Sequence, residues 1–401
     1  MNYISQSKEY KNKLLERFLR YVKIWSESNG ELADSGVFPS TPQQFDFAKI
    51  LEKELNDLGL KEVQVTKDCY VYAYLPGNTD TTESILLMAH MDTVDEVTGK
   101  NVNPQIAKNP VAFTGDETDT IVTTDGTTLL GADDKAGVAA IMSTIEYLVE
   151  NPQLKHCPVE VMFSPDEETG HGMDRVPLNL IKSKCAYTVD GGDLGEMETE
   201  CFNAWAANIK FTGKSTHTGD AKAGKMVNAS VMASTFVANL PRHKAPETTE
   251  KYEGFIAPMK IQGTIDSAEV DLLLRAFTTE EIEEEKSIIQ KNAEAIKACF
   301  SGEVEVTFVQ QYLNMKENLD KNPAVIQRLE KAFEKAGVEI VRKPIRGGTD
   351  GSRLTEMGIP TPNIFTGAHN FHSRFEWLSL NQMSKAADVL INLLEDLCTN
   401  T

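Results

Sequence analysis

Five side chains that can bind a metal ion follow short apolar runs at separate places along the 401-residue chain. Each is a histidine or an acidic residue: His90, Asp133, Glu168, Asp190 and His372. Two imidazoles and three carboxylates suit a pair of zinc ions, because both donor types bind that metal well. One carboxylate can bridge two ions at roughly 3.5–4 Å and leave positions open for water. These donors therefore predict a two-metal site that can activate a water molecule.

Each candidate ligand also has an ordinary structural explanation. Asp133 opens an apolar helical pattern, where a carboxylate interacts favourably with the free N–H groups of the first turn. His90 and Asp92 form an isolated His-x-Asp pair. Such a pair is most often a polar strand end whose histidine is hydrogen-bonded and binds no metal. Glu167 and Glu168 are adjacent acids in a loop and would normally be solvated. Singly, each ordinary explanation is the better one, but their joint occurrence at successive strand ends favours a shared site.

The segments that precede these residues predict the strands of one sheet. Residues 85–89 are apolar on both faces, as expected of an interior parallel strand covered by helices. Residues 159–163 and 186–189 are similar short apolar runs, and residues 136–150 have a helical pattern. This alternation predicts a doubly wound, mostly parallel α/β sheet, in which ligands bind beyond the carboxyl ends of the strands. The candidate ligands fall at that edge.

A change of pattern near residue 204 predicts an inserted second domain. From there the chain shows strand, helix, strand, strand, helix and strand patterns at 205–211, 226–239, 259–262, 270–277, 279–298 and 304–309. This order predicts an α+β domain with a four-stranded sheet and two helices. The expected boundaries are residues 1–204 and 315–401 for a catalytic domain, and 205–314 for an inserted lid and dimerisation domain.

The composition argues against several classes of partner. With 40 Lys and Arg against 60 Asp and Glu, the formal charge is -20, which disfavours nucleic acid and membrane surfaces. No run approaches the ~18 apolar residues that a membrane helix needs, and the first residues lack the apolar core of a signal peptide. Six cysteines without a CxxC pair are expected to be free thiols. The sequence therefore predicts a cytoplasmic location.

The phrases around the candidate ligands resemble those of the co-catalytic zinc exopeptidases, the family that includes carboxypeptidase G2 and aminoacylase-1. The shared motifs are His90-Met91-Asp92, Gly131-Ala132-Asp133-Asp134-Lys135, Pro165-Asp166-Glu167-Glu168 and residues 187–192 and 372–376. Within that family, residues 99–106, 123–126, 343–351 and 362–367 are similar to the tripeptide aminopeptidases. The resemblance covers the chain from about Leu14 to the last helix. The loop between Gln105 and Ile121 is shorter than is typical, and the first residues have no counterpart.

The resemblance implies a metal role for each matching ligand. It makes Asp133 the bridge between two Zn²⁺ ions, for which Co²⁺ or Mn²⁺ could substitute. His90 and Asp190 would complete one metal site. Glu168 and His372 would complete the other.

The resemblance also implies which residues support the chemistry. Glu167 would be the general base, because it stands beside a ligand and a carboxylate there can take a proton from water. Asp92 would orient His90, as a carboxylate commonly does behind a metal-bound histidine. Asp134 competes with its neighbour as the bridge but is expected to cap the helix. His217, in the inserted domain, would stabilise the tetrahedral oxyanion; without the resemblance it would be taken for a surface residue.

Four residues of this pattern are expected to contact substrate. Arg275 and Arg346 would bind the C-terminal carboxylate of a peptide, since arginine presents two parallel donors to a carboxylate. Asn228 and Gly348 would contact the peptide main chain. For Arg275, pairing with a neighbouring acid is an equally good interpretation.

The activity implied is removal of the N-terminal residue from tripeptides by a cytoplasmic metallopeptidase. Alternatives within the family are a dipeptidase, a carboxypeptidase-like enzyme and an N-acyl amino acid hydrolase. An inactive metal-binding homologue is the alternative from another class. The expected partners are small peptides, with no nucleic acid and no membrane. A homodimer through the inserted domain, and His217 acting within or across chains, both stay open.

Overall fold

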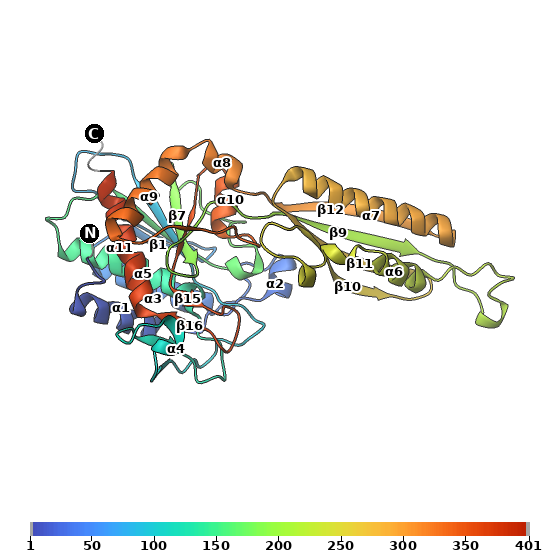
Figure 1. The fold of residues 1–401 in the computed structure, drawn as a ribbon, viewed down its shortest axis with the longest axis horizontal. Helices are drawn as coiled ribbons and strands as arrows, with labels where there is room; N and C mark the ends of the chain where they lie inside the picture. Colours follow the sequence, from blue (N-terminus) through green and yellow to red (C-terminus); the bar gives the residue numbers. More distant parts are fainter. Residues whose placement is uncertain (1–2, 398–401) are drawn as a thin grey trace. The chain divides into compact units, whose positions relative to one another are not determined.

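The computed structural model describes residues 3–397, which divide into two units (Figure 1). The α/β domain runs to Thr199 and includes Met315–Lys343 and the chain from Thr349 onward. The inserted domain comprises Glu200–Asn314 and Pro344–Gly348. The predicted boundaries did not include Pro344–Gly348 in the insert. Arg346 joins this segment to the insert, because its guanidinium donates to two main-chain carbonyl oxygens there, at 2.8 Å each.

Eight strands form the sheet of the α/β domain, in the order β1-β2-β6-β3-β7-β14-β8-β13. In that order they span Lys61–Val65, Val71–Leu75, Val159–Ser164, Ile85–His90, Ala186–Gly191, Asn363–Phe365, Glu196–Glu198 and Val341–Arg342. The four central strands β6, β3, β7 and β14 are parallel, whereas β1, β2 and β8 add antiparallel pairings. Every residue of β3 and β6 is buried, as predicted for interior strands. The predicted mostly parallel α/β sheet is confirmed.

The two faces of this sheet are covered differently. Five long helices pack into the larger core: α1 (Lys8–Tyr21), α3 (Gln44–Asp57), α5 (Ala132–Glu150), α9 (Pro323–Ala336) and α11 (Leu380–Asp396). A smaller core on Leu86, Met88 and Met162 is covered by α10 (Asp350–Glu356), through Leu354, and by Met173. Because β-strand side chains alternate between faces, neighbouring strand residues enter different cores.

Short elements complete the α/β domain. They are α2 (Gly30–Asp34), α4 (Val111–Thr114), α8 (Lys316–Asp320), the 3₁₀ helix η1 (Glu167–Thr169) and a sheet of β15 (Ala368–His369), β16 (Trp377–Ser379), β5 (Ile121–Thr123) and β4 (Gln105–Ile106). This small sheet had no signal in the sequence, because its strands are too short for a period to be recognised. Across residues 3–397, no helix has the length and apolar character to cross a bilayer.

The inserted domain has one antiparallel sheet in the order β10-β11-β9-β12. Its elements are β9 (Asn203–Thr212), α6 (Ala229–Ala238), β10 (Phe255–Gly263), β11 (Ser267–Ala276), α7 (Thr279–Phe300) and β12 (Glu303–Tyr312). Figure 1 shows α6 and α7 beside this sheet, and both contact its strands. Burial alternates along β11, since one face meets the helices and the other is more exposed. The predicted order of strands and helices is confirmed.

Candidate metal centre

The five predicted ligands come together at the carboxyl edge of the α/β sheet. His90 ends β3, Asp190 is near the end of β7, Asp133 is in the first turn of α5, Glu168 is in η1 after β6, and His372 follows β15. Four short distances join their side chains. Nε2 of His90 lies 2.9 Å from Oδ1 of Asp133 and 3.4 Å from Oδ1 of Asp190. Nε2 of His372 lies 3.2 Å from Oδ2 of Asp133 and 3.0 Å from Oε2 of Glu168. Asp133 thus presents one carboxylate oxygen to each imidazole.

The donor atoms fit a divalent cation. Two groups, His90 with Asp133 and Glu168, and His90 with Glu167 and Asp190, have ligand atoms within 4.8 Å of one another. Oε1 of Glu168 is buried without a hydrogen-bond partner. Leaving a buried carboxylate oxygen unpaired is costly, and a bound cation would remove that cost. Mixtures of imidazole and carboxylate donors bind several divalent transition metals, zinc among them.

The side chains of this cluster perturb one another electrostatically. Burial and the charge of Asp133 raise the pKa of Glu168 to about 8. Burial raises the pKa of Asp190 to about 6, although the charge of His90 opposes the shift. Burial also favours a higher pKa for Asp133, but hydrogen bonds with His372 and His90 outweigh it and lower that pKa. Hydrogen bonds to Asp133 and Glu168 raise the pKa of His372 to about 11. A cation placed among these buried carboxylates would offset their mutual repulsion.

Asp92 connects His90 with the turn that carries the predicted base. Nδ1 of His90 lies 3.1 Å from the main-chain oxygen of Asp92 and 3.4 Å from its Oδ1. The carboxylate of Asp92 also accepts the main-chain N–H groups of Glu167, at 3.0 Å, and of Glu168, at 3.2 Å. The sequence placed Asp92 beside His90 but offered no signal for the second pair of bonds. One buried carboxylate therefore orients both an imidazole and the η1 turn.

The loop before Asp133 is held by Glu376. The carboxylate of Glu376 accepts the main-chain N–H groups of Leu130 and Gly131, at 2.7 Å each, and of Asp133, at 3.0 Å. Burial raises the pKa of Glu376 to about 7, and these three hydrogen bonds oppose the shift. Glu376 thus fixes the main chain from which the Asp133 carboxylate projects.

Asp134, the competing bridge, bonds to main chain instead. Its Oδ1 accepts the N–H of Gly137 at 3.0 Å, and its Oδ2 accepts the N–H of His90 at 3.2 Å. Gly137 allows α5 to begin against β7, because a Cβ there would lie 1.8 Å from the main-chain oxygen of Val189. Because of this close approach, Asp133 at the start of α5 and Asp190 near the end of β7 lie close together.

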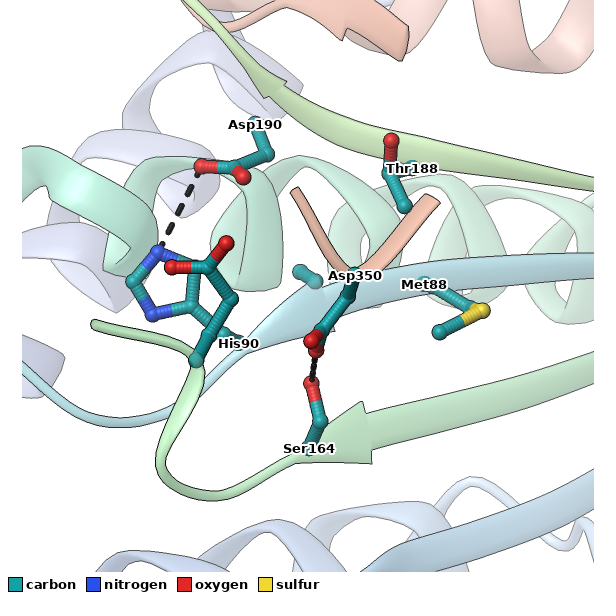
Figure 2. Close-up of a pocket in the computed structure, with 8 residues that line it drawn as sticks. Met88, His90, Ser164, Thr188, Asp190 and Asp350 are labelled. Atoms are coloured by element: carbon teal, nitrogen blue, oxygen red, sulfur yellow. Dashed lines mark hydrogen bonds and ion pairs between the residues drawn. The ribbon is translucent and has the colours of Figure 1, made fainter. Parts of the chain in front are cut away.

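A carboxylate that the sequence analysis did not assign lies beside the cluster. Figure 2 shows Asp350 in a pocket with His90 and Asp190, and Ser164 below it. Oγ of Ser164 donates to Oδ2 of Asp350 at 2.5 Å. Burial raises the pKa of Asp350 to about 7. Asp350 belongs to the motif at residues 343–351 that resembles the family, but the sequence indicated no role for it.

His217 contacts its own turn in the inserted domain. It precedes the 3₁₀ helix η2 (Thr218–Asp220), and its Nδ1 accepts the N–H of Gly219 at 3.2 Å. Its side chain is 81% exposed, and Nδ1 lies 3.8 Å from Oδ2 of Asp220. The predicted role of His217 in stabilising an oxyanion stays a prediction.

Both predicted substrate-binding arginines hold main chain of the inserted domain. Nη1 of Arg275 donates to the carbonyl oxygens of Leu274, at 2.9 Å, and Trp205, at 3.3 Å. The Arg346 guanidinium donates to the main-chain oxygens of Lys251 and Glu253. It also lies over the ring of Phe202, 5.1 Å from its centroid. These contacts are a structural function that the sequence analysis did not anticipate for Arg346.

Asn228 and Gly348 also have local structural functions. Oδ1 of Asn228 accepts the N–H groups of Ser230, at 3.0 Å, and Val231, at 3.3 Å, and so caps α6. A Cβ on Gly348 would lie 2.5 Å from the ring of Tyr312. A helix cap and a close approach account for these residue types without a ligand, and their substrate contacts stay predictions.

The profile of peptidase family M20/M25/M40 matches residues 86–396. The chain belongs to this family. Relatives named peptidase T, from Clostridium perfringens and Bacillus licheniformis, are each 42% identical to it, and each comparison covers 96% of this chain and 98% of the relative. The predicted membership of a peptidase family is confirmed, and the M20 chain is a hydrolase.

Solved structures share the M20 fold of this chain. Aminopeptidase PepT from Bacillus cereus has a TM-score of 0.79 at 23% identity and covers 97% of this chain and 99% of its own. A tripeptidase from Staphylococcus aureus has a TM-score of 0.80 at 22% identity, with 97% and 98% covered. A dinuclear metal-binding M20 peptidase from Bacillus subtilis has a TM-score of 0.68 at 16% identity, with 98% and 100% covered. At these identities the likeness shows the two-domain M20 fold.

Proposed function

We propose that this M20 chain is a di-metal tripeptide aminopeptidase that removes the N-terminal residue from tripeptides. The observation that carries the proposal is the Asp133 carboxylate, whose two oxygens face the imidazoles of His90 and His372 at 2.9 and 3.2 Å. The names of the relatives, peptidase T, and of the S. aureus tripeptidase support the choice of substrate.

The donors would hold two cations, with Asp133 contributing to both. His90 and Asp190 would hold one cation together with Asp133, and Glu168 and His372 would hold the other. Zn²⁺ fits these donors, and Co²⁺ or Mn²⁺ could replace it. The dinuclear metal binding named for the B. subtilis neighbour supports two ions. When bound, the cations would polarise the scissile carbonyl and lower the pKa of a water toward ~7.

Glu167 is the proposed general base. Asp92 accepts its main-chain N–H at 3.0 Å and so fixes the main chain from which its side chain projects. Burial raises the pKa of Glu167 well above its ordinary value, and a higher pKa makes a carboxylate a stronger base. Glu167 would take the proton of the attacking water on a carboxylate oxygen and pass it to the nitrogen of the departing amine.

The remaining assignments concern substrate and setting. We assign His217 to the oxyanion, and Asn228, Arg275, Arg346 and Gly348 to the substrate main chain and C-terminal carboxylate. A negative overall charge and free cysteines support a cytoplasmic location. A homodimer through the inserted domain is part of the same proposal.

A substrate panel with controlled metal content tests this function. We expect the purified chain to cleave unblocked tripeptides at the first peptide bond, to lose activity with a chelator and to regain it with Zn²⁺ or Co²⁺. Dipeptides, N-acetylated tripeptides and N-acyl amino acids form the comparison set. Preferred cleavage of an N-acyl amino acid would replace the proposal with an N-acyl hydrolase. No cleavage by the metal-loaded protein would indicate an inactive homologue.

A further inference from the structure

We propose that Asp350 is a positioning residue, whose carboxylate fixes both ends of the turn from Ser164 to Gly172. That turn carries Glu167 and Glu168. The catalytic consequence rests on the proposed function, whereas the structural consequence can be measured without it.

The α10 helix holds Asp350 firmly in place. Thr349 caps the helix in a reciprocal arrangement with Ser352, in which Thr349 Oγ1 accepts the N–H of Ser352 at 3.3 Å. Gly351 lets the helix start lie against β7, because a Cβ there would be 3.2 Å from Oγ1 of Thr188 and 2.9 Å from the main-chain oxygen of Thr361. Leu354 is fully buried in the smaller core. The main chain of Asp350 is therefore part of a rigid, capped helix.

The first end of the turn is bound to one oxygen of Asp350. Ser164 is the last residue of β6, and its Oγ donates to Oδ2 of Asp350 at 2.5 Å (Figure 2). Both side chains are buried, so water does not compete for this bond. A hydrogen bond to a carboxylate in such surroundings is about twice as strong as one between neutral groups.

The second end of the turn lies against the other oxygen of Asp350. A Cβ on Gly172 would be 2.3 Å from Oδ1 of Asp350, so any larger residue there would displace this carboxylate. The main-chain oxygen of Gly172 accepts the hydroxyl of Tyr70 at 2.6 Å, which holds the glycine there. One carboxylate thus contacts the residues at both ends of the turn.

The middle of the turn is fixed from another side. Asp92 accepts the N–H groups of Glu167 and Glu168, and Asp166 accepts the N–H of Ser40 at 2.6 Å. With its ends and its middle held by different carboxylates, the turn keeps one conformation. Releasing the ends would displace the base, and a displacement of about 1 Å can cost roughly a hundredfold in rate.

Substitution of Asp350 tests this role. We expect Asp350→Ala to lower kcat for a tripeptide about tenfold to a hundredfold, with KM changed less than about threefold. Metal affinity should fall as well, because Glu168 lies in the same turn, so kcat is compared at saturating metal. Asp350→Asn, which keeps the shape and can still bond to the Ser164 hydroxyl, should restore most of kcat. Ser164→Ala should show a smaller loss than Asp350→Ala.

Ser5→Ala is the matched control, because Ser5 Oγ also donates at 2.5 Å to a buried aspartate, Asp388. It should leave kcat unchanged. Equal losses in Ser164→Ala and Ser5→Ala, or an Asp350→Ala variant with undiminished kcat at saturating metal, would overturn the proposal.

Hydrogen exchange of the turn supplies a second measurement that does not need activity. Amides of residues 164–172 should exchange faster in Asp350→Ala than in the unaltered chain and in Ser5→Ala. Unchanged exchange across this segment would contradict the proposal even if no peptide is cleaved. Failure of the unaltered protein to cleave tripeptides would instead count against the proposed function alone.

Discussion

The two domains treat their predicted functional residues in opposite ways. In the α/β domain, histidines and acids from five separate segments meet at distances of 2.9 to 3.4 Å. In the inserted domain, each predicted residue contacts its own neighbourhood, and the His217 side chain is 81% exposed. Parallel strands direct their carboxyl ends to one edge, whereas the antiparallel sheet alternates chain direction and gathers no such edge. Sheet topology therefore assembles the metal donors, while substrate contacts are not preassembled within the insert.

Glu167→Gln tests the residues assembled in the α/β domain and should have the largest effect on kcat. The amide keeps the size of the side chain but cannot take a proton from water. We expect kcat for a tripeptide to fall by about 10²–10⁴, with metal content unchanged, as measured by steady-state kinetics and elemental analysis. Glu317→Gln, at an exposed carboxylate, is the control. A kcat close to that of the unaltered chain would mean that the cluster does not use this base.

His217→Ala tests the inserted domain and should have a smaller effect on kcat. If His217 stabilises the oxyanion, kcat should fall more than about tenfold, because one donor to developing charge is lost. Metal content should not change, since His217 is not one of the predicted metal ligands and its side chain is 81% exposed. His243→Ala, at another exposed histidine of the inserted domain, is the matched control. Equal kcat in both variants would remove His217 from the mechanism and leave catalysis to the α/β domain.

Glu285→Gln measures how much a buried carboxyl group destabilises the inserted domain, and it should have the smallest effect on activity. Glu285 of α7 is fully buried, neither carboxylate oxygen has a hydrogen-bond partner, and Lys244 Nζ lies 3.6 Å from Oε1. Burial raises the pKa of Glu285 from 4.5 to about 8, although Lys244 opposes the shift. Between these values the folded chain keeps a proton that the unfolded chain releases, so stability falls as pH rises.

Glutamine has no proton to lose and should therefore abolish this dependence. We expect Glu285→Gln to raise the unfolding temperature by a few degrees at pH 9 and hardly at all at pH 4.5, as followed by calorimetry. Glu294→Gln, at an exposed carboxylate on the same helix that takes no part in the Glu285 pKa shift, should shift neither value. An equal gain at both pH values would show that the substitution improves packing and does not remove a buried charge.

The sequence was informative wherever a residue type and its place in a strand or helix coincide. The buried run of β3, the acids after β6 and the acid near the end of β7 predicted a parallel sheet with a metal site at its carboxyl edge, because apolar runs and their ends can be recognised locally. The order of elements in the inserted domain followed from the same periodicities. The four substrate-binding predictions rest on resemblance, and the structure adds caps and main-chain contacts that explain the same residue types.

What the sequence alone determined about this protein is the set of donors and the elements that end in them. The way the donors are held becomes visible in the folded chain: Asp92 binds the Glu167 turn, Glu376 binds the main chain at Asp133, and Asp350 lies between Ser164 and Gly172. Each of these carboxylates bonds to residues distant along the chain, and no local period records such a pairing. Burial and main-chain geometry select the hydrogen-bond partner of each carboxylate once the sheet has formed. A sequence can therefore predict the metal ligands without predicting the residues that position them.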